Sequence, residues 1–447
     1  MISRILPLAC AAGLLLSPLH ALADTTPATT ATASAKDAAD SIDALTAKAK
    51  SGDVSAMRKL GAAYRDGDGV DSDSAQAFTW LKKAADTGDA DSLADFGELY
   101  LWGTGVDKDQ AHAAELFQKA ADKGSALGQN DLGWAYDQGI GLKQDFAAAM
   151  KWYQKAIDQN YAPAMNNLGK MYDFGRGVTE DNVAAVKFYQ RSADLGDSYG
   201  QFLLGTMYDD GTGVKQDYAE AIKWYLKGAD GKSGGALNRL GEMSEDGKGM
   251  AKDEKKAFDY YTRGAKVGND AAMSSLGRFY FYGHGTDADM GDAFKWFARA
   301  AMDDYADGER NLGIMYEYGD FLPTDGDQAL KWYTKAADQH DANAEAHIGE
   351  MYLNGVGIKA DYAQALKWLT LGANAGDDFA QYNLGTMYEH AYGVPQNRVE
   401  ALKWYILASD QDNDDARKAA EHLRQTAGFG EAGKAQVAAS AFKPVKQ

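Results

Sequence analysis

The sequence predicts an all-α solenoid of ten 36-residue helix–turn–helix repeats, and two observations support that prediction. A glycine that follows an apolar residue, and precedes a tyrosine by three places in nine copies, recurs every 36 residues from Gly61 to Gly385. Around each of these marker glycines, apolar residues are spaced three and four apart, as in a helix with one buried face. One helix pair is too small to bury its own apolar face, so neighbouring repeats must stack into a continuous core.

The first residues are typical of a secretory signal peptide. Arg4 precedes a short apolar stretch, and the Ala-Leu-Ala sequence that ends at Ala23 has the small-x-small form of a signal-peptidase site. We therefore expect a signal peptide over residues 1–23, cleavage after Ala23, and a periplasmic or secreted mature protein; an uncleaved anchor is the alternative. Cleavage also removes Cys10, the only cysteine, which leaves no disulfide, cysteine nucleophile or thiolate metal ligand.

Four segments follow the signal peptide. Residues 24–36 are rich in threonine and alanine, as in a flexible linker. Residues 37–52 align with the second half of a repeat and predict an N-terminal cap helix. The ten repeats occupy residues 53–412, and residues 413–447 predict C-terminal cap helices and a tail. Caps with a polar outer side keep such arrays soluble.

The fifth repeat shows how each repeat is built. Residues 198–210 and 218–230 each have an apolar face at helical spacing, and a glycine-containing loop joins them. In that loop we expect Gly211 to end the first helix, Val214 to fill the core and Asp217 to cap the second helix. A phosphate-binding loop is the alternative, but this loop recurs in eight repeats and joins two helices, whereas a P-loop follows a strand.

The repeats also share columns of small, aromatic and polar residues. Counted from the marker glycine, alanine stands at +16 in all ten repeats, tryptophan at +19 in seven, and aspartate or asparagine at +12 in all ten. The pattern A-x-x-LG-x-x-Y-x-x-G-x-GV-x-x-D…A-x-x-W-Y-x-x-A resembles the Sel-1-like repeat (SLR) family, and residues 164–178 and 381–394 are close matches. The resemblance covers residues 53–412 and implies a right-handed α/α superhelix whose concave surface is lined by the first helices.

Charge restricts the classes of partner. The chain carries 46 Lys and Arg against 65 Asp and Glu, a formal net charge of −19. This charge argues against a nucleic-acid partner, because phosphate binding needs clustered Lys and Arg. It also disfavours docking on an anionic membrane surface. A protein or an extended peptide of basic character is the partner that the charge favours.

No catalytic, metal-binding or cofactor motif is evident, so we expect a non-enzymatic protein without metal or cofactor. Acidic residues 66–73 lack the glycine and glutamate that an EF-hand calcium loop requires. The histidines form no H-x-x-x-H pair; His340, His347 and His390 lie in adjacent repeats, and we interpret them as exposed polar side chains. Residues 440–443 have the S-x-x-K form of penicillin-interacting enzymes, but they lie in the tail without companion motifs.

The surface best suited to binding lies on the first helices, outside the core columns. By analogy with tetratricopeptide grooves, its positions are −3, +1, +4 and +5 from the marker glycine. These positions carry acidic residues through repeats three to six, interleaved with aromatic residues, and this mixture suits a basic extended peptide. A solvated face with aromatic residues packed between helices is the alternative. The candidate binding residues are Trp102, Trp134, Asp137, Asp173, Phe174, Asp209, Asp210, Tyr282 and Tyr318.

Together these features predict an exported, non-enzymatic scaffold or adaptor that binds protein or peptide partners along a concave face. The family resemblance implies a role in envelope complex assembly, signalling or host interaction. Two alternatives stay open. One is a penicillin-binding, hydrolase-like activity, as described for cysteine-rich relatives whose cysteines are absent here. The other is carbohydrate binding or polysaccharide export, since sugars stack on aromatic rings and hydrogen-bond to carboxylates.

Overall fold

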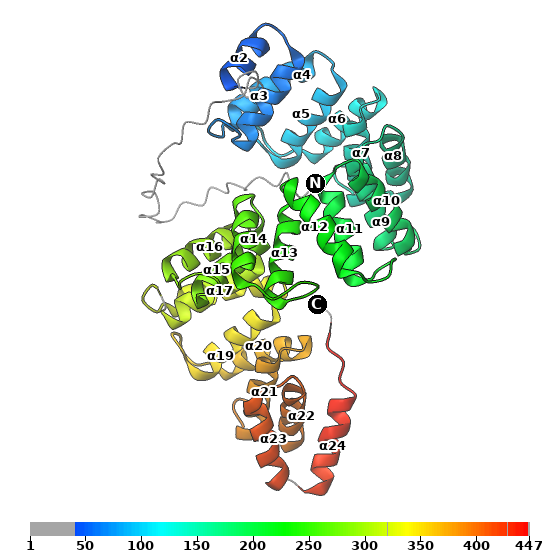
Figure 1. Cartoon of the computed structure of the whole chain (residues 1–447). Coiled ribbons are helices and arrows are strands. Elements are labelled where there is room, and N and C mark those ends of the chain that lie inside the picture. The colour runs from blue at the N-terminus through cyan, green and yellow to red at the C-terminus, as the bar shows by residue number, and fades with distance from the viewer. Residues whose placement is uncertain (1–40, 320, 427, 446–447) are drawn as a thin grey trace. The chain divides into compact units, whose positions relative to one another are not determined.

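Each repeat folds as two consecutive helices joined by the glycine-containing loop (Figure 1). A computed structural model describes residues 41–319, 321–426 and 428–445, so the predicted signal peptide and linker lie outside the described residues. Those ranges contain 23 α-helices and no strand, which confirms the all-α solenoid of ten repeats. Among the described residues, no helix combines the length and the apolar character that a membrane span requires.

The helices follow the repeat in register. The helix before the first repeat is α2 (Ile42–Lys50), and two helices follow the last repeat, α23 (Asp414–Thr426) and α24 (Phe429–Ser440). The first helices of the repeats are α3 (Val54–Asp66), α5 (Ala90–Trp102), α7 (Ala126–Gln138), α9 (Ala162–Asp173), α11 (Ser198–Asp210), α13 (Gly234–Asp246), α15 (Asp270–Tyr282), α17 (Ala306–Tyr318), α19 (Ala342–Asn354) and α21 (Asp378–His390). The second helices are α4 (Ser74–Asp86), α6 (Gln110–Asp122), α8 (Phe146–Asp158), α10 (Asn182–Asp194), α12 (Tyr218–Asp230), α14 (Glu254–Lys266), α16 (Met290–Met302), α18 (Gly326–Asp338), α20 (Tyr362–Ala375) and α22 (Arg398–Ser409).

The polar +12 column and the loop glycines set the helix ends. The second helix of each repeat begins directly after the +12 residue. The side chain of that residue accepts a hydrogen bond from a backbone N–H in the first turn of the helix. Asp217, for example, accepts from the N–H groups of Ala219 and Glu220 at 3.0 and 3.1 Å. Gly211 ends α11 in the left-handed region, at φ 72°, where a Cβ would be strained. Val214 lies partly buried against the core of repeats four and five, so the predicted roles of all three loop residues are confirmed.

The marker glycine makes room for a large side chain from the second helix. In all ten repeats, a Cβ built on this glycine would lie within 3.0 Å of the side chain at +20. At Gly205 the nearest atoms are ring carbons of Tyr225, at 2.6 Å. The absence of a side chain at the marker therefore lets the +20 residue reach the first helix. The +20 residues, all buried, are Leu81, Phe117, Tyr153, Tyr189, Tyr225, Tyr261, Phe297, Tyr333, Leu369 and Tyr405.

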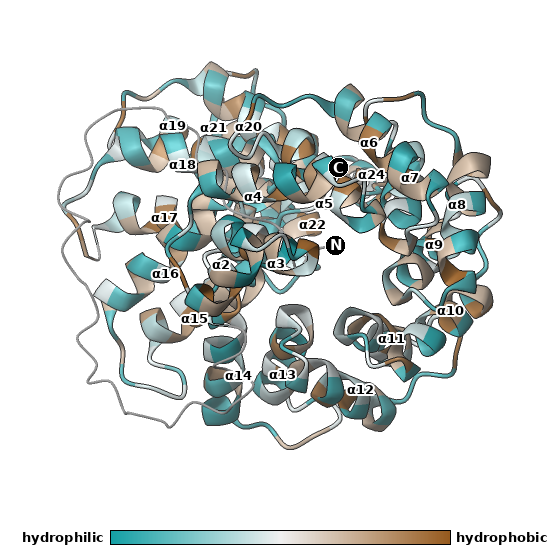
Figure 2. Ribbon diagram, turned by 90° about the horizontal axis from the view of Figure 1, so that it is seen from above, coloured by the Kyte–Doolittle hydropathy of each residue, from teal (hydrophilic) through white to brown (hydrophobic). Residues whose placement is uncertain are grey.

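The described chain divides into two compact units, unit 1 up to Ala236 and unit 2 from Leu237, with the boundary inside α13. In each unit the two helices of a repeat contact each other, and a second helix contacts the first helix of the next repeat. First helices of consecutive repeats also contact one another, as α5 does α7 and α19 does α21. The first helices thus form a continuous layer in each unit, and apolar and polar residues alternate along the helices (Figure 2).

The C-terminal helices and tail cover the last repeats. α23 and α24 both contact α22, and the buried Leu423 and Ala435 join the core of the tenth repeat. Beyond α24, Phe442 packs edge-on against Trp404 with ring centroids 5.5 Å apart. The S-x-x-K sequence at 440–443 therefore lies where the tail docks on the repeats.

Candidate partner-binding surface

The +5 position supplies the exposed row of the first helices. All ten +5 side chains are exposed, whereas the preceding +4 side chains are buried or half-buried, because successive residues of a helix point about 100° apart. We call these residues the exposed row of each unit. In unit 1 the exposed row is Asp66, Trp102, Gln138, Phe174 and Asp210. In unit 2 it is Asp246, Tyr282, Tyr318, Asn354 and His390.

Four residues of the exposed rows are large aromatics. Their exposed fractions are 53% for Trp102, 68% for Phe174, 64% for Tyr282 and 57% for Tyr318. A ring left in water gains none of the free energy that apolar burial gives to folding. Exposed aromatics that recur at one helix position are therefore typical of a surface that buries them against a partner.

Trp134 extends this surface in unit 1. It stands at +1 of the third repeat, half-buried against the core, and its ring lies 6.5 Å from that of Trp102 at an angle of 40°. The two indoles come from neighbouring first helices, α5 and α7. Rigid aromatic pairs of this kind offer a large contact area that loses little conformational entropy on binding.

The predicted acidic residues at +4 lie beneath the exposed row. Asp137 and Asp209 are only 2% and 1% exposed, and Asp173 is half-buried. Among the predicted acids, Asp210 at +5 is the one whose side chain is exposed. The acidic series through repeats three to six is thus largely internal, and the carboxylates on the surface are fewer than the sequence suggests.

Each acidic +4 side chain is matched by a tyrosine at +20 of the same repeat. In the six repeats with tyrosine at +20, the +4 residue is aspartate or glutamate; in the other four it is Arg65, Leu101, Phe281 or Leu353. The two columns considered separately do not show this co-occurrence, whereas a comparison of them repeat by repeat does. In five repeats the tyrosine hydroxyl donates to the carboxylate, at 3.1 Å for Asp173, 3.2 Å for Asp209, 2.9 Å for Glu245, 2.6 Å for Glu317 and 2.7 Å for Glu389.

Basic side chains compensate some of these buried carboxylates. Burial raises the pKa of Asp137, although Arg176, 3.1 Å away, opposes that rise. Burial also acts on Glu245, but two hydrogen bonds of 2.7 Å from Arg278 outweigh it and lower the pKa of this carboxyl. Burial and the charge of Glu245 raise the pKa of Tyr261, so its hydroxyl remains a hydrogen-bond donor at neutral pH.

The three histidines of the last repeats have different environments. His340 and His390 are exposed, as predicted. The prediction is wrong for His347, whose side chain is only 14% exposed and whose Nδ1 lies 3.4 Å from a carboxylate oxygen of Glu317. His347 lies with Glu317 and Glu350, side chains that a search for H-x-x-x-H within one helix does not find.

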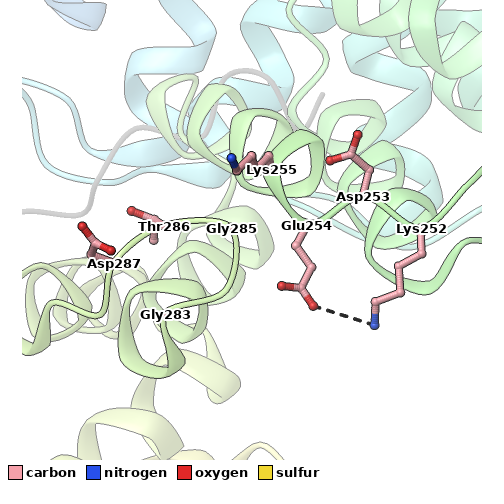
Figure 3. Close-up of a pocket in the computed structure, with 8 residues that line it drawn as sticks. All are labelled: Lys252, Asp253, Glu254, Lys255, Gly283, Gly285, Thr286 and Asp287. Atoms are coloured by element: carbon pink, nitrogen blue, oxygen red, sulfur yellow. Dashed lines mark ion pairs between the residues drawn. The ribbon is translucent and has the colours of Figure 1, made fainter.

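A hollow of about 750 Å³ lies in unit 2 between the loops that follow α13 and α15 (Figure 3). Its lining includes Lys252 and Glu254, whose Nζ and Oε1 atoms are 3.9 Å apart, together with Asp287 and loop glycines. Small-molecule sites are usually enclosed and mostly apolar. This shallow, charged hollow between recurring loops has the character of solvated surface instead.

Comparisons with known proteins agree with this architecture. A crystal structure of c5321, described as a protective antigen present in uropathogenic Escherichia coli strains displaying an SLR fold, is 32% identical over 90% of this chain and 86% of that chain, with a TM-score of 0.60. A Sel1 repeat protein from Oxalobacter formigenes is 31% identical over 59% of this chain and 99% of that chain, with a TM-score of 0.49. A search of curated proteins found no match. The family model for the Sel1 repeat matches residues 54–89, 90–125, 126–161, 162–197, 198–233, 235–269, 270–305, 306–341, 342–377 and 378–413.

Proposed function

The chain belongs to the Sel1 repeat family, and from that premise we propose that it is an exported, non-enzymatic scaffold that binds protein partners along its exposed rows. Sel1-repeat solenoids are a helical fold commonly used for protein–protein interaction. Such a fold suits this role because its layer of first helices offers an extended surface to a partner.

The observation that carries the proposal is the repeated exposure of aromatic residues at +5. Trp102, Phe174, Tyr282 and Tyr318 are each more than half exposed, whereas the aromatic residues at +20 of the same fold are buried. Aromatic side chains are enriched at the centres of protein interfaces and dominate their binding energy. We therefore assign these four residues, with Trp134, as anchors for the partner.

The charge of the exposed rows favours a basic, extended peptide segment. Asp210 and Asp246 stand on the same rows as the aromatic anchors, and the chain as a whole carries a net charge of −19. Charges at the edge of an interface mainly speed association and select the partner, while buried aromatic contacts hold it. Carbohydrate binding on the indole pair is the competing outcome of the test below.

Export rests on the signal-like N-terminus that ends at Ala23. The similarity to a protein described as a protective antigen supports a location outside the cytoplasm. N-terminal sequencing of the mature chain tests this part: Asp24 as the first residue supports export with cleavage, and retention of residues 1–23 contradicts cleavage after Ala23.

Site-specific photo-crosslinking in cells tests the binding surface. A photoreactive residue at Phe174 or Tyr318 should capture a protein partner through a basic segment. The matched controls are Val183, in α10, and Met302, the last residue of α16, because they are 55% and 78% exposed but belong to second helices. Equal capture from all four positions would contradict the assignment, and capture of glycan alone would favour the carbohydrate alternative.

A further inference from the structure

Three side chains with metal-ligating atoms converge in unit 2, between repeats eight and nine. Glu317 lies near the end of α17, and His347 and Glu350 lie three residues apart in α19, on one face of that helix. One ligand atom from each of the three lies within 4.8 Å of the other two. The group is thus built by two consecutive first helices.

Other repeat boundaries place a cation at the same positions. Between repeats one and two, Arg65 at +4 pairs with Glu98 at +1 of the next repeat, at 2.8 Å. Between repeats six and seven, Glu245 at +4 pairs with Arg278 at +1, at 2.7 Å. In both cases an arginine at one position faces an acid at the other, and Arg65 also pairs with its neighbour Asp66 at 2.8 Å.

Between repeats eight and nine, both positions hold acids, Glu317 at +4 and Glu350 at +1. Within the described part of the chain, neither of them forms an ion pair with a lysine or arginine. The side chain of Glu317 is only 3% exposed. One carboxylate oxygen of Glu350 and Nδ1 of His347 are buried without a hydrogen-bond partner. A buried carboxylate beside a half-buried one, without a cation to compensate them, is costly in free energy.

Tyr333 of α18 holds two of the three side chains in place. Its hydroxyl donates to an oxygen of Glu317 at 2.6 Å. Its ring also stacks on the imidazole of His347, with centroids 4.9 Å apart and planes within 4°. Hydrogen bonds and contacts of this kind orient the ligands of metal sites and fix the imidazole plane.

We propose that Glu317, His347 and Glu350 bind a divalent first-row transition-metal ion, of which Zn²⁺ is the probe of choice. One imidazole nitrogen and two carboxylate oxygens are ligands that Zn²⁺ accepts in proteins. Ca²⁺ and Mg²⁺ favour sites made of oxygen ligands alone. The bound ion supplies the positive charge that arginine supplies at the other two boundaries, and it links α17 to α19.

Calorimetric titration of the tag-free, chelator-treated full chain with Zn²⁺ tests the proposal. We expect one ion per chain, and binding at least about tenfold weaker in Glu350→Gln and His347→Asn than in the unchanged protein. The matched control is His390→Asn, because His390 is an exposed histidine 3.9 Å from Glu389 and lies outside the group. That control should bind Zn²⁺ with unchanged affinity, and titration with Ca²⁺ should show much weaker binding.

Thermal unfolding gives a second readout that does not depend on how well the His347 variant folds. Zn²⁺ should raise the melting temperature of the unchanged protein and raise that of Glu350→Gln by less at the same concentration, because the variant has lost one of the three ligands and binds the ion more weakly. Without metal, Glu350→Gln should be at least as stable as the unchanged protein, since it removes one of two neighbouring negative charges. Absence of Zn²⁺ binding by the unchanged protein, or binding by both ligand variants that is as tight as in the unchanged protein, would overturn the proposal.

Discussion

The +20 side chain contacts the marker glycine in every repeat, and in five repeats its hydroxyl also bonds to the +4 carboxylate. In the fifth repeat Tyr225 lies against Gly205, and its hydroxyl reaches Asp209 one turn further along the same helix. The marker position thus requires glycine because there is no space for a Cβ. The +4 position requires an acid because the buried hydroxyl needs a hydrogen-bond acceptor.

Substitution of the marker glycine tests the first half of this contact. Gly205→Ala should destabilise the fifth repeat by about 1–3 kcal/mol, because the new Cβ meets the ring of Tyr225. Hydrogen exchange in α11 and α12 measures this locally, since long repeat arrays do not unfold as one unit. The control is Gly433→Ala in α24, where a Cβ has no atom within 4 Å and should stabilise by up to about 1 kcal/mol. Unchanged exchange in Gly205→Ala would contradict the steric argument.

At the scale of helices, the tyrosine–carboxylate bond joins the two helices of a repeat. The second repeat shows that an apolar pair does the same task, because Leu101 and Phe117 occupy the two positions there and both are buried. The residue types at +4 and +20 of one repeat therefore depend on each other. Changing one of the two polar residues alone removes a hydrogen bond from the buried polar group that remains.

A double-mutant cycle on Asp209 and Tyr225 tests that coupling. Tyr225→Phe and Asp209→Leu should each cost about 1–3 kcal/mol, since each leaves the other group buried with one bond fewer. The double variant reproduces the apolar pair of the second repeat and should cost less than the sum by at least about 1 kcal/mol. The free energy of unfolding of the fifth repeat is measured in urea, with hydrogen exchange as the probe. Additive losses of this free energy would show that the two positions are independent.

Helices, caps and loops could be predicted from the sequence because their signals are local. Gly211 and Asp217 act within a few residues of the chain, and the 36-residue period repeats their pattern ten times. The burial of Asp137 and Asp209 could not be predicted from position alone, since +4 lies at the edge of the apolar face. The partners are also distant in sequence: Tyr225 of the second helix for Asp209, and Arg176 of the next repeat for Asp137. The grouping of His347 with Glu317 also needed the structure, because its ligands come from two repeats.

At the scale of the whole molecule, each unit presents its own exposed row. Unit 1 carries Trp102 and Phe174 with Asp210, and unit 2 carries Tyr282 and Tyr318. The same position of the repeat thus supplies aromatic anchors in both units. We infer that these exposed rows, rather than the loops or the second helices, recognise the partner.

The most direct test measures the affinity of the protein for a series of extended peptides that contain increasing numbers of lysine and arginine residues. A variant with Trp102, Phe174, Tyr282 and Tyr318 all changed to alanine should keep its helical circular dichroism and bind basic peptides at least about tenfold more weakly. A control variant with Val183→Ala and Met302→Ala should bind like the unchanged protein. Unchanged affinity in the fourfold variant, or an equal loss in the control, would contradict the account.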